Sequence, residues 1–172
     1  MMNRSRLLAC AALAAAVHAA NAGAIDFPIM KSGMWEQKLS RDVTEKAPIV
    51  TRICIDADVQ KQMLDMGMGT MKSMCAKNDI RREGGKMYGE AECRLGDSTM
   101  KSKSVTSFTG DTAYRTEVKA TYSPPFMGKS AATTVIEAKW TGACPAGVKA
   151  GDMILPDGRT MNIRAATGAA KQ

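Results

Sequence analysis

Short segments in which apolar and polar residues alternate, separated by turn residues, constrain the fold more than any other feature of this sequence. Residues 112–122 illustrate the pattern, because Tyr114 and Tyr122 alternate with charged neighbours, as in a strand that buries one face. Gly84-Gly85 and Gly96-Asp97 lie between such segments and are typical two-residue hairpin turns. Strands joined by tight hairpins are antiparallel, so the pattern predicts a β-meander.

The second of these hairpins is also supported by its charges. With a two-residue turn, Glu92 faces Lys101 and Glu90 faces Lys103. Opposite charges directly across an antiparallel ladder each contribute roughly 0.2–1 kcal/mol. Two such pairs in one hairpin therefore predict the register of its strands.

One helix is expected to interrupt the strands. Asp56 follows a β-branched segment at 49–55 and has the side chain of an N-cap. We expect the helix to run to about Met66 and to be loosened or ended by Gly67 and Gly69. The predicted fold is mainly β: an antiparallel meander, forming a curved sheet or a partly closed barrel, with one helical insert covering one side or end.

The first residues predict export. Arg4 and Arg6 form a short positive region, residues 7–20 are apolar, and Ala22-Gly23-Ala24 fits a small-x-small cleavage pattern. We expect a signal peptide at 1–24, a single disulfide-stabilised mainly-β domain at 25–165 and a frayed tail at 166–172. No later segment is apolar over transmembrane length. The positive start and the alanine-rich apolar segment are typical of bacterial signal peptides, which favours a periplasmic location in a Gram-negative cell, with secretion as the alternative.

Cleavage at this position would remove His18, the only histidine, and would lower the formal net charge from +7 to +5. A chain without histidine has no Ser-His-Asp or Cys-His nucleophile and no His-ligated zinc or iron. Paired carboxylates such as Glu90 and Glu92 are explained by cross-strand ion pairs. We therefore expect no catalytic residues. The basic residues are too dispersed for a nucleic-acid binder, and they mildly favour anionic partners.

Four cysteines remain after the predicted cleavage: Cys54, Cys75, Cys93 and Cys144. An even number in an exported domain, without a Cys-x-x-Cys pair, predicts two structural disulfides. Our preferred pairing is Cys75 with Cys93 and Cys54 with Cys144. The Cys75–Cys93 bond conflicts with the expected two-residue turn, because the two cysteines face each other only if the Gly84 loop has three residues. A two-residue loop places them on opposite faces of the hairpin.

Five methionines crowd twelve residues: Met63, Met66, Met68, Met71 and Met74. Three interpretations stay open. Methionine fills irregular cores and forms adaptable apolar binding surfaces, and its thioether is a ligand for Cu(I). The glycines within the segment argue against a regular helix, and spacings of two and three residues suit ligands that converge on a flexible segment. We expect no cofactor, and copper is the alternative.

Four aromatic residues are candidates for a ligand-binding surface: Trp35, Tyr114, Tyr122 and Trp140. In a barrel-like sheet such side chains line a cavity. Aromatic residues at period-two spacing more commonly pack in the core, so both interpretations remain open.

The order of these features resembles a known family. Lys31-Ser32-Gly33-Met34-Trp35-Glu36 comes first, then Cys54 before an acidic helix start, Cys75 and Cys93 around a hairpin, and Cys144-Pro145 after the last long strand. Over residues 30–150 this resembles an uncharacterised family of small exported bacterial proteins, a domain of unknown function with a Gly-x-Trp-Glu start and four spaced cysteines. Met34 stands where Leu is expected most often. The resemblance implies export and disulfides and supplies no catalytic residues.

Together these features predict a non-enzymatic envelope protein. We expect it to bind an apolar or anionic ligand, or a protein partner, and to bind no nucleic acid. The alternative is a periplasmic Cu(I)-binding protein that uses the Met63–Met74 cluster.

Overall fold

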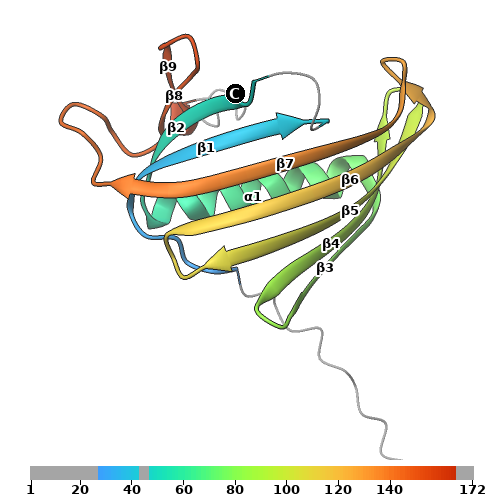
Figure 1. Ribbon diagram of the computed structural model, residues 1–172, viewed down its shortest axis with the longest axis horizontal. Coiled ribbons are helices and arrows are strands. Elements are labelled where there is room, and N and C mark those ends of the chain that lie inside the picture. The colour runs from blue at the N-terminus through green and yellow to red at the C-terminus, as the bar shows by residue number, and fades with distance from the viewer. Residues whose placement is uncertain (1–26, 43–46, 166–172) are drawn as a thin grey trace, which may run out of the picture.

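A computed structural model of the protein describes residues 27–42 and 47–165. The strands of these residues form one antiparallel sheet in the spatial order β3-β4-β5-β6-β7-β1-β2-β8-β9 (Figure 1). The sheet is curved (Figure 1). It has two edges, β3 and β9, so it is open and does not close into a barrel. The predicted mainly-β antiparallel fold is confirmed. The predicted signal peptide and tail lie outside the described residues.

The elements follow one another along the chain with short connections. They are β1 (Gly33–Arg41), β2 (Ile49–Ile55), α1 (Ala57–Met74), β3 (Cys75–Glu83), β4 (Lys86–Leu95), β5 (Ser98–Thr109), β6 (Ala113–Phe126), β7 (Lys129–Gly142), β8 (Asp152–Ile154) and β9 (Thr160–Asn162).

Strands β3 to β7 form the predicted meander, each paired with the next. The charge pairs expected across the β4–β5 hairpin are present. Glu92 lies opposite Lys101 with an O–N distance of 3.3 Å, and Glu90 lies opposite Lys103 at 3.6 Å. The register predicted from these charges is confirmed.

The N-terminal hairpin β1–β2 joins the meander at its far side. β1 pairs with β7 on one side and with β2 on the other, and β2 continues to β8. The sheet order therefore departs from the chain order at two places, where β7 meets β1 and where β2 meets β8.

Helix α1 begins where the sequence predicts and ends later. The Asp56 carboxylate accepts a hydrogen bond from the Val59 N–H at 2.7 Å, which makes it the N-cap. The prediction that Gly67 and Gly69 end the helix near Met66 is wrong, because α1 continues through both to Met74. Each glycine costs about 1 kcal/mol in helix propensity. The end of the helix is held instead by Cys75, whose N–H donates to the Met71 carbonyl and whose side chain is bonded to β4.

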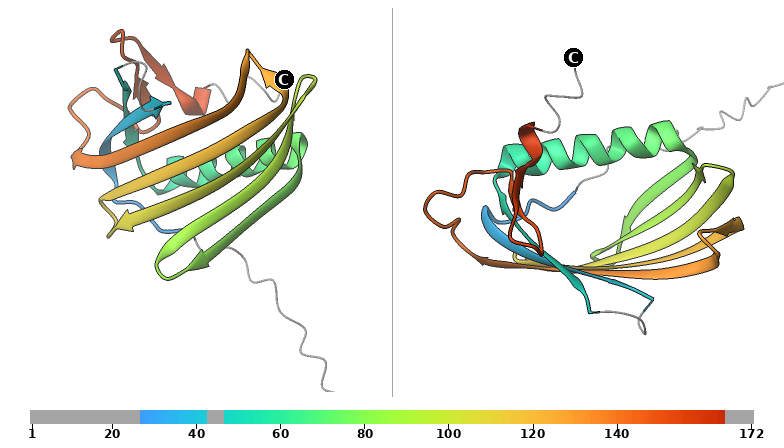
Figure 2. Two further views of the ribbon diagram at one scale, coloured as in Figure 1. Left: turned by 45° about the vertical axis from the view of Figure 1, so that its right-hand side comes forward. Right: turned by 90° about the horizontal axis from the view of Figure 1, so that it is seen from above.

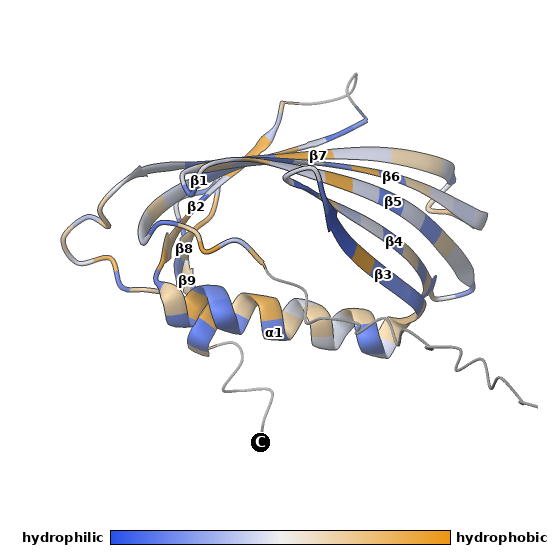
Figure 3. Ribbon diagram, turned by 90° about the horizontal axis from the view of Figure 1, so that it is seen from below, coloured by the Kyte–Doolittle hydropathy of each residue, from blue (hydrophilic) through white to orange (hydrophobic). Residues whose placement is uncertain are grey.

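The helix crosses the concave face of the curved sheet (Figures 2 and 3). Its first turns pack on the core, which lies at one end of this face. The core consists of Trp35, Ile53, Ile55, Val59, Ala138 and Ile163. Among the described residues, α1 included, no helix combines the length and apolar character needed to cross a bilayer. The buried contacts of α1 are thus concentrated at its N-terminal end, and its second half is largely exposed.

Both preferred disulfides are confirmed. Cys54 bonds to Cys144, and Cys75 bonds to Cys93. The β3–β4 turn has two residues, as Glu83 pairs with Lys86, and on that basis alone Cys75 and Cys93 would face apart. A β-bulge between Cys75 and Lys77 adds one residue to β3, which brings the two cysteines opposite each other.

Candidate functional site

The register of the sheet arranges side chains in rows across the concave face. One row contains Phe108, Tyr114 and Ala138, and the next contains Met87, Thr106 and Thr116. The two rows after these consist mostly of short side chains: Gly89, Ser104, Val118 and Thr134, then Ala91, Ser102, Ala120 and Ala132. The floor beneath α1 is therefore lined by small residues in its middle, with larger side chains towards the core.

A pocket of about 350 Å³ lies between α1, the segment before β1 and the concave face. Its apolar lining comes from three parts of the fold: Phe27 and Met30 before β1, Met63 and Leu64 on α1, and Met87 and Phe108 on the sheet. The first half of α1 thus forms the roof of a chamber whose floor is the sheet.

Gln60 holds the N-terminal segment against the helix. Its side-chain oxygen accepts a hydrogen bond from the Met30 N–H at 2.9 Å, and its Nε2 donates to the Pro28 carbonyl at 2.7 Å. One wall of the pocket is therefore fixed in position by an amide whose oxygen and nitrogen are both engaged.

The polar groups of the floor also have partners within the protein. The hydroxyls of Thr106 and Thr116 lie 2.8 Å apart, and Gln37 Nε2 donates to the Tyr114 hydroxyl at 2.9 Å. Burial raises the pKa of the Tyr114 phenol, which therefore stays neutral. Among the residues that the structure describes, those lining the pocket include no charged side chain. Its chemistry suits an apolar ligand that makes few hydrogen bonds.

Beyond the pocket, space remains between α1 and the sheet at the turn that contains Gly67. Gly67 follows Met63 and Leu64 at helical spacing, so it belongs to the same face of α1. A Cβ atom added at Gly67 would meet no atom within 4 Å outside its chain neighbours and the adjacent helix backbone. The helix is therefore not packed down onto the sheet at this turn.

The four predicted aromatic residues are separated by the fold. Trp35 is buried in the core with its ring centroid 6.1 Å from that of Tyr114, and Tyr114 lines the pocket. Trp140 packs on the core beneath Lys31, whose Nζ lies 4.0 Å from its ring centroid. Tyr122 lies at the opposite end of β6. Of the four, Tyr114 is the residue that the structure places at the pocket.

The predicted methionine cluster lies along α1. Met63 lines the pocket, and the Met71 sulfur lies 3.8 Å from that of Cys75. Met66, Met68 and Met74 are exposed. In a regular helix successive residues are rotated by about 100°, so Met63 and Met68 point roughly 140° apart. The five thioethers therefore do not converge on one point.

Several pocket residues were missed from the sequence. Thr106 and Phe108 alternate on β5, and Thr116 faces Thr106 across the next hairpin, so aligning the strands by their turns would have placed these residues on one face. Gln60 and Leu64 lie one helical turn apart on α1. The contribution of Phe27 and Met30 has no signal in the sequence.

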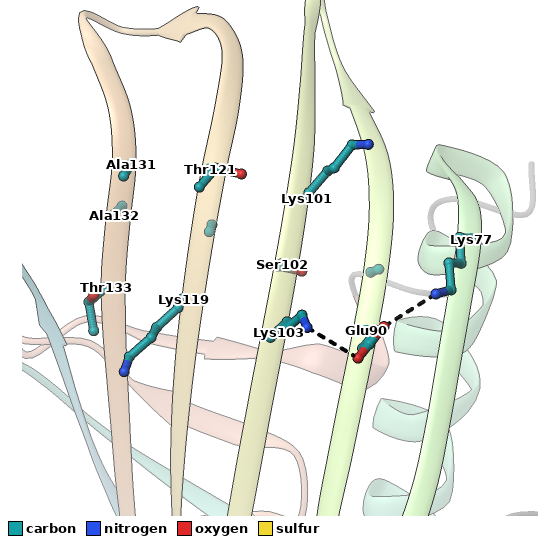
Figure 4. A pocket seen from close by; sticks show the side chains of 12 residues that line it. Lys77, Glu90, Lys101, Ser102, Lys103, Lys119, Thr121, Ala131, Ala132 and Thr133 are labelled. Carbon is teal, nitrogen blue, oxygen red and sulfur yellow. Dashed lines mark hydrogen bonds and ion pairs between the residues drawn. The ribbon is translucent and has the colours of Figure 1, made fainter.

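A second hollow, of about 540 Å³, lies on the other face of the sheet (Figure 4). Lysine side chains form its walls, and they are largely exposed: 67% for Lys101 and 80% for Lys103. Glu90 accepts a hydrogen bond from Lys77 at 3.2 Å and pairs with Lys103, which lowers the pKa of its carboxyl. Side chains this exposed cannot exclude water from a ligand, so this hollow is a solvated, salt-bridged surface.

The described part of the chain contains no group of three or more His, Cys, Asp or Glu side chains placed to hold a metal ion.

These features define a class: an open antiparallel sheet with a helix across its concave face and an apolar pocket between the two layers. The chain belongs to the family described as a protein of unknown function (DUF3617), whose profile matches residues 30–144. The match spans β1 to β7, α1 and all four disulfide-bonded cysteines. Searches of the curated proteins and of the solved structures find no match.

Proposed function

We propose that the protein is an exported, non-enzymatic binding protein that holds an apolar ligand between α1 and the concave face of the sheet. The observation that carries this proposal is the pocket beneath Met63 and Leu64, whose walls are apolar and whose polar groups already have partners. Burying apolar surface contributes about 25 cal/mol per Å², and here the ligand would displace water from walls that bind it weakly.

Two features support export. The first is the signal pattern of residues 1–24. The second is the pair of disulfides, which form and persist in oxidising compartments such as the periplasm. The mass of protein recovered from a periplasmic fraction without reductant tests both points. We expect cleavage near Ala24 and the loss of four hydrogens; an uncleaved or fully reduced chain would contradict the proposal.

The pocket is tested by filling it. Leu64→Trp places an indole into the space, whereas Asp65→Trp adds the same group one position later, where the side chain is 67% exposed. Solvent screens the exposed Lys61–Asp65 pair, so losing it has little effect on stability and the control is expected to fold.

The measurement is fluorescence titration with a single-chain fatty-acid probe and with a hydrophobic dye. We expect the unmodified protein and Asp65→Trp to bind alike, and Leu64→Trp to bind at least about tenfold more weakly. Equal binding by both tryptophan variants would place the ligand elsewhere. A complete lack of probe binding by the unmodified protein would favour a protein partner or an anionic ligand instead.

A Cu(I)-binding role is the second candidate. Met68, Met71 and Met74 occupy successive turns of α1, so neighbouring thioethers share its C-terminal end. Replacing these three with Leu preserves helix propensity and removes the soft ligands. If this role is correct, a Cu(I) titration of the triple variant loses the binding seen with the unmodified chain. Copper binding that survives the replacement would exclude this segment as the site.

A further inference from the structure

We propose that the tip of the β6–β7 hairpin docks on a lipid surface that carries anionic headgroups. The tip consists of Phe126 and Met127, and it lies at the end of the sheet opposite the core. This inference concerns a different surface from the pocket and does not depend on a ligand being bound there.

The tip extends beyond the rest of the meander. The row Cys75, Cys93, Met100 and Tyr122 lies near this end of the concave face, and beyond it β4 and β5 continue only to the pair Leu95–Ser98. Strand β6 continues past this row for four more residues, with a register shift between Thr121 and Phe126. The hairpin therefore projects past its neighbours at this end of the sheet (Figure 1).

The two apolar residues of the tip differ in their roles. The Phe126 ring rests on Tyr122, with centroids 5.9 Å apart, and stays 37% exposed. Met127 is 87% exposed. Phe126 is thus anchored on Tyr122, whereas Met127 projects into solvent. Together they give the tip an apolar end that no other part of the described protein covers.

The backbone at Met127 adds a second observation. Phe126 pairs with Lys129, and the two turn residues between them have φ values of 49° for Met127 and 78° for Gly128. A two-residue turn with both φ values positive favours Asn or Gly at its first position. An unbranched apolar side chain there is held in an unfavourable conformation while being exposed to water, so neither folding nor solubility explains it.

Charge at the same end complements an anionic surface. Arg94 on β4 lies in the cross-strand row that includes Ser123, where the tip begins, and no carboxylate of the described chain lies within ion-pair distance of it. Lys72 in the last turn of α1 likewise has no carboxylate partner among the described residues. Glu92 and Asp97 are the acidic residues nearest to Arg94 in the chain, and Glu92 pairs with Lys101. After the proposed cleavage, which removes Arg4 and Arg6, the chain still carries a formal net charge of +5.

The small size of the tip favours a bilayer over a protein partner. A stable protein interface buries about 800 Å² on each partner, far more than two side chains provide. Membrane anchoring works with a few apolar residues at headgroup depth, and each nearby cation adds attraction to anionic lipid. A lipid surface is therefore the occupant that this combination fits.

The test is co-sedimentation of the exported chain, purified from the periplasm after cleavage near Ala24, with vesicles of phosphatidylcholine alone and with vesicles containing phosphatidylglycerol. The decisive variant is Met127→Asn, because Asn suits the positive φ and removes the apolar side chain. We expect preferential binding to the anionic vesicles, and about a tenfold weaker partition for Met127→Asn without loss of thermal stability. Met127→Leu keeps the apolar group and should bind as the unmodified chain does.

Ile29→Ser is the matched control, since Ile29 is 78% exposed but belongs to the segment beside the pocket. It should leave vesicle binding unchanged. Vesicle binding that is absent, or that is equal in Met127→Asn, would overturn the proposal, as would self-association through the tip detected by sedimentation velocity. The Leu64→Trp variant should still bind vesicles, so failure of the pocket proposal and failure of this one are distinguishable.

Discussion

Cys75 and Cys93 lie opposite each other with Cα atoms 3.7 Å apart, although a regular ladder from their two-residue turn would place them on different faces. The bulge at Ala76 makes the difference. Cys75 is also the residue at which α1 ends and β3 begins. One disulfide therefore joins the end of the helix to the second strand of the meander.

This relationship predicts how the helix responds to loss of the bond. In a Cys75→Ser/Cys93→Ser variant we expect the segment after Gly67 to fray, because the glycines then act without a fixed end beyond them. Hydrogen exchange of the Met68–Met74 amides should rise strongly, while amides of the first turn, held by Asp56, stay protected. Unchanged protection beyond Gly67 would contradict our explanation of why the helix continues.

The two disulfides should differ in their contribution to stability. Cys75 and Cys93 are 18 residues apart, and Cys54 and Cys144 are 90 apart. Loop-closure entropy gives about 3 kcal/mol for the shorter loop and about 1.4 kcal/mol more for the longer one. Urea unfolding of the two double Cys→Ser variants measures this order. A greater loss from the shorter loop would show that folded-state contacts outweigh chain entropy.

Gly33 is predicted to be intolerant of any side chain. A Cβ atom there would lie 2.3 Å from the Gly142 carbonyl oxygen and 2.4 Å from Trp140 Nε1. Gly142 has almost the same φ, 138° against 137°, but an added Cβ would meet nothing within 4 Å. Gly142→Ala should therefore cost about 1–2 kcal/mol from backbone strain alone. Gly33→Ala should cost about 1–3 kcal/mol more from overlap. Equal costs in denaturant titrations would refute the close contact.

We expect Asp152 to contribute to the loss of folding stability at low pH. Hydrogen bonds from Asn162 Nδ2 and from the Lys149 N–H, both 2.7 Å long, hold the pKa of its carboxyl below the usual value. Because the folded pKa is the lower one, this contribution to stability is fully present above the unfolded pKa, about 3.9. It is lost as the pH falls through the folded pKa.

The measurement is the free energy of unfolding in urea between about pH 2 and 6. Asp152→Asn should flatten its decline below about pH 4, and Asn162→Ala should do the same by removing the main donor. If both variants kept the full acid dependence of the unmodified chain, other carboxylates would account for it.

Local patterns were sufficient to predict much of the fold. Alternation and turn residues predict the strands from β4 to β6, and the Glu90 and Glu92 pairs predict the register of β4 with β5. These features are decided by residues close together in the chain, where propensity and pairing energies act in the same direction. The preferred disulfide pairing is also found, although the predicted two-residue turn opposed the Cys75–Cys93 bond.

Features that depend on distant contacts were not predictable in this way. The continuation of α1 past Gly67 depends on a bond to Cys93, and the bulge at Ala76 has no distinctive residue. The pocket brings Met30, Leu64 and Phe108 together from three separate segments. No periodicity relates such residues, so the site emerges only once the helix is placed over the sheet.

The order of strands in the sheet also implies an order of events in folding. Strands β3 to β7 are joined by short hairpins and pair with their chain neighbours, so their contacts close small loops and form fast. Strand β1 ends at Arg41, whereas its partner β7 begins only at Lys129. During synthesis the first hairpin must therefore wait, with one edge unpaired, until most of the chain has emerged. The N-terminal strands, made first, can join the meander only after β7 has been made.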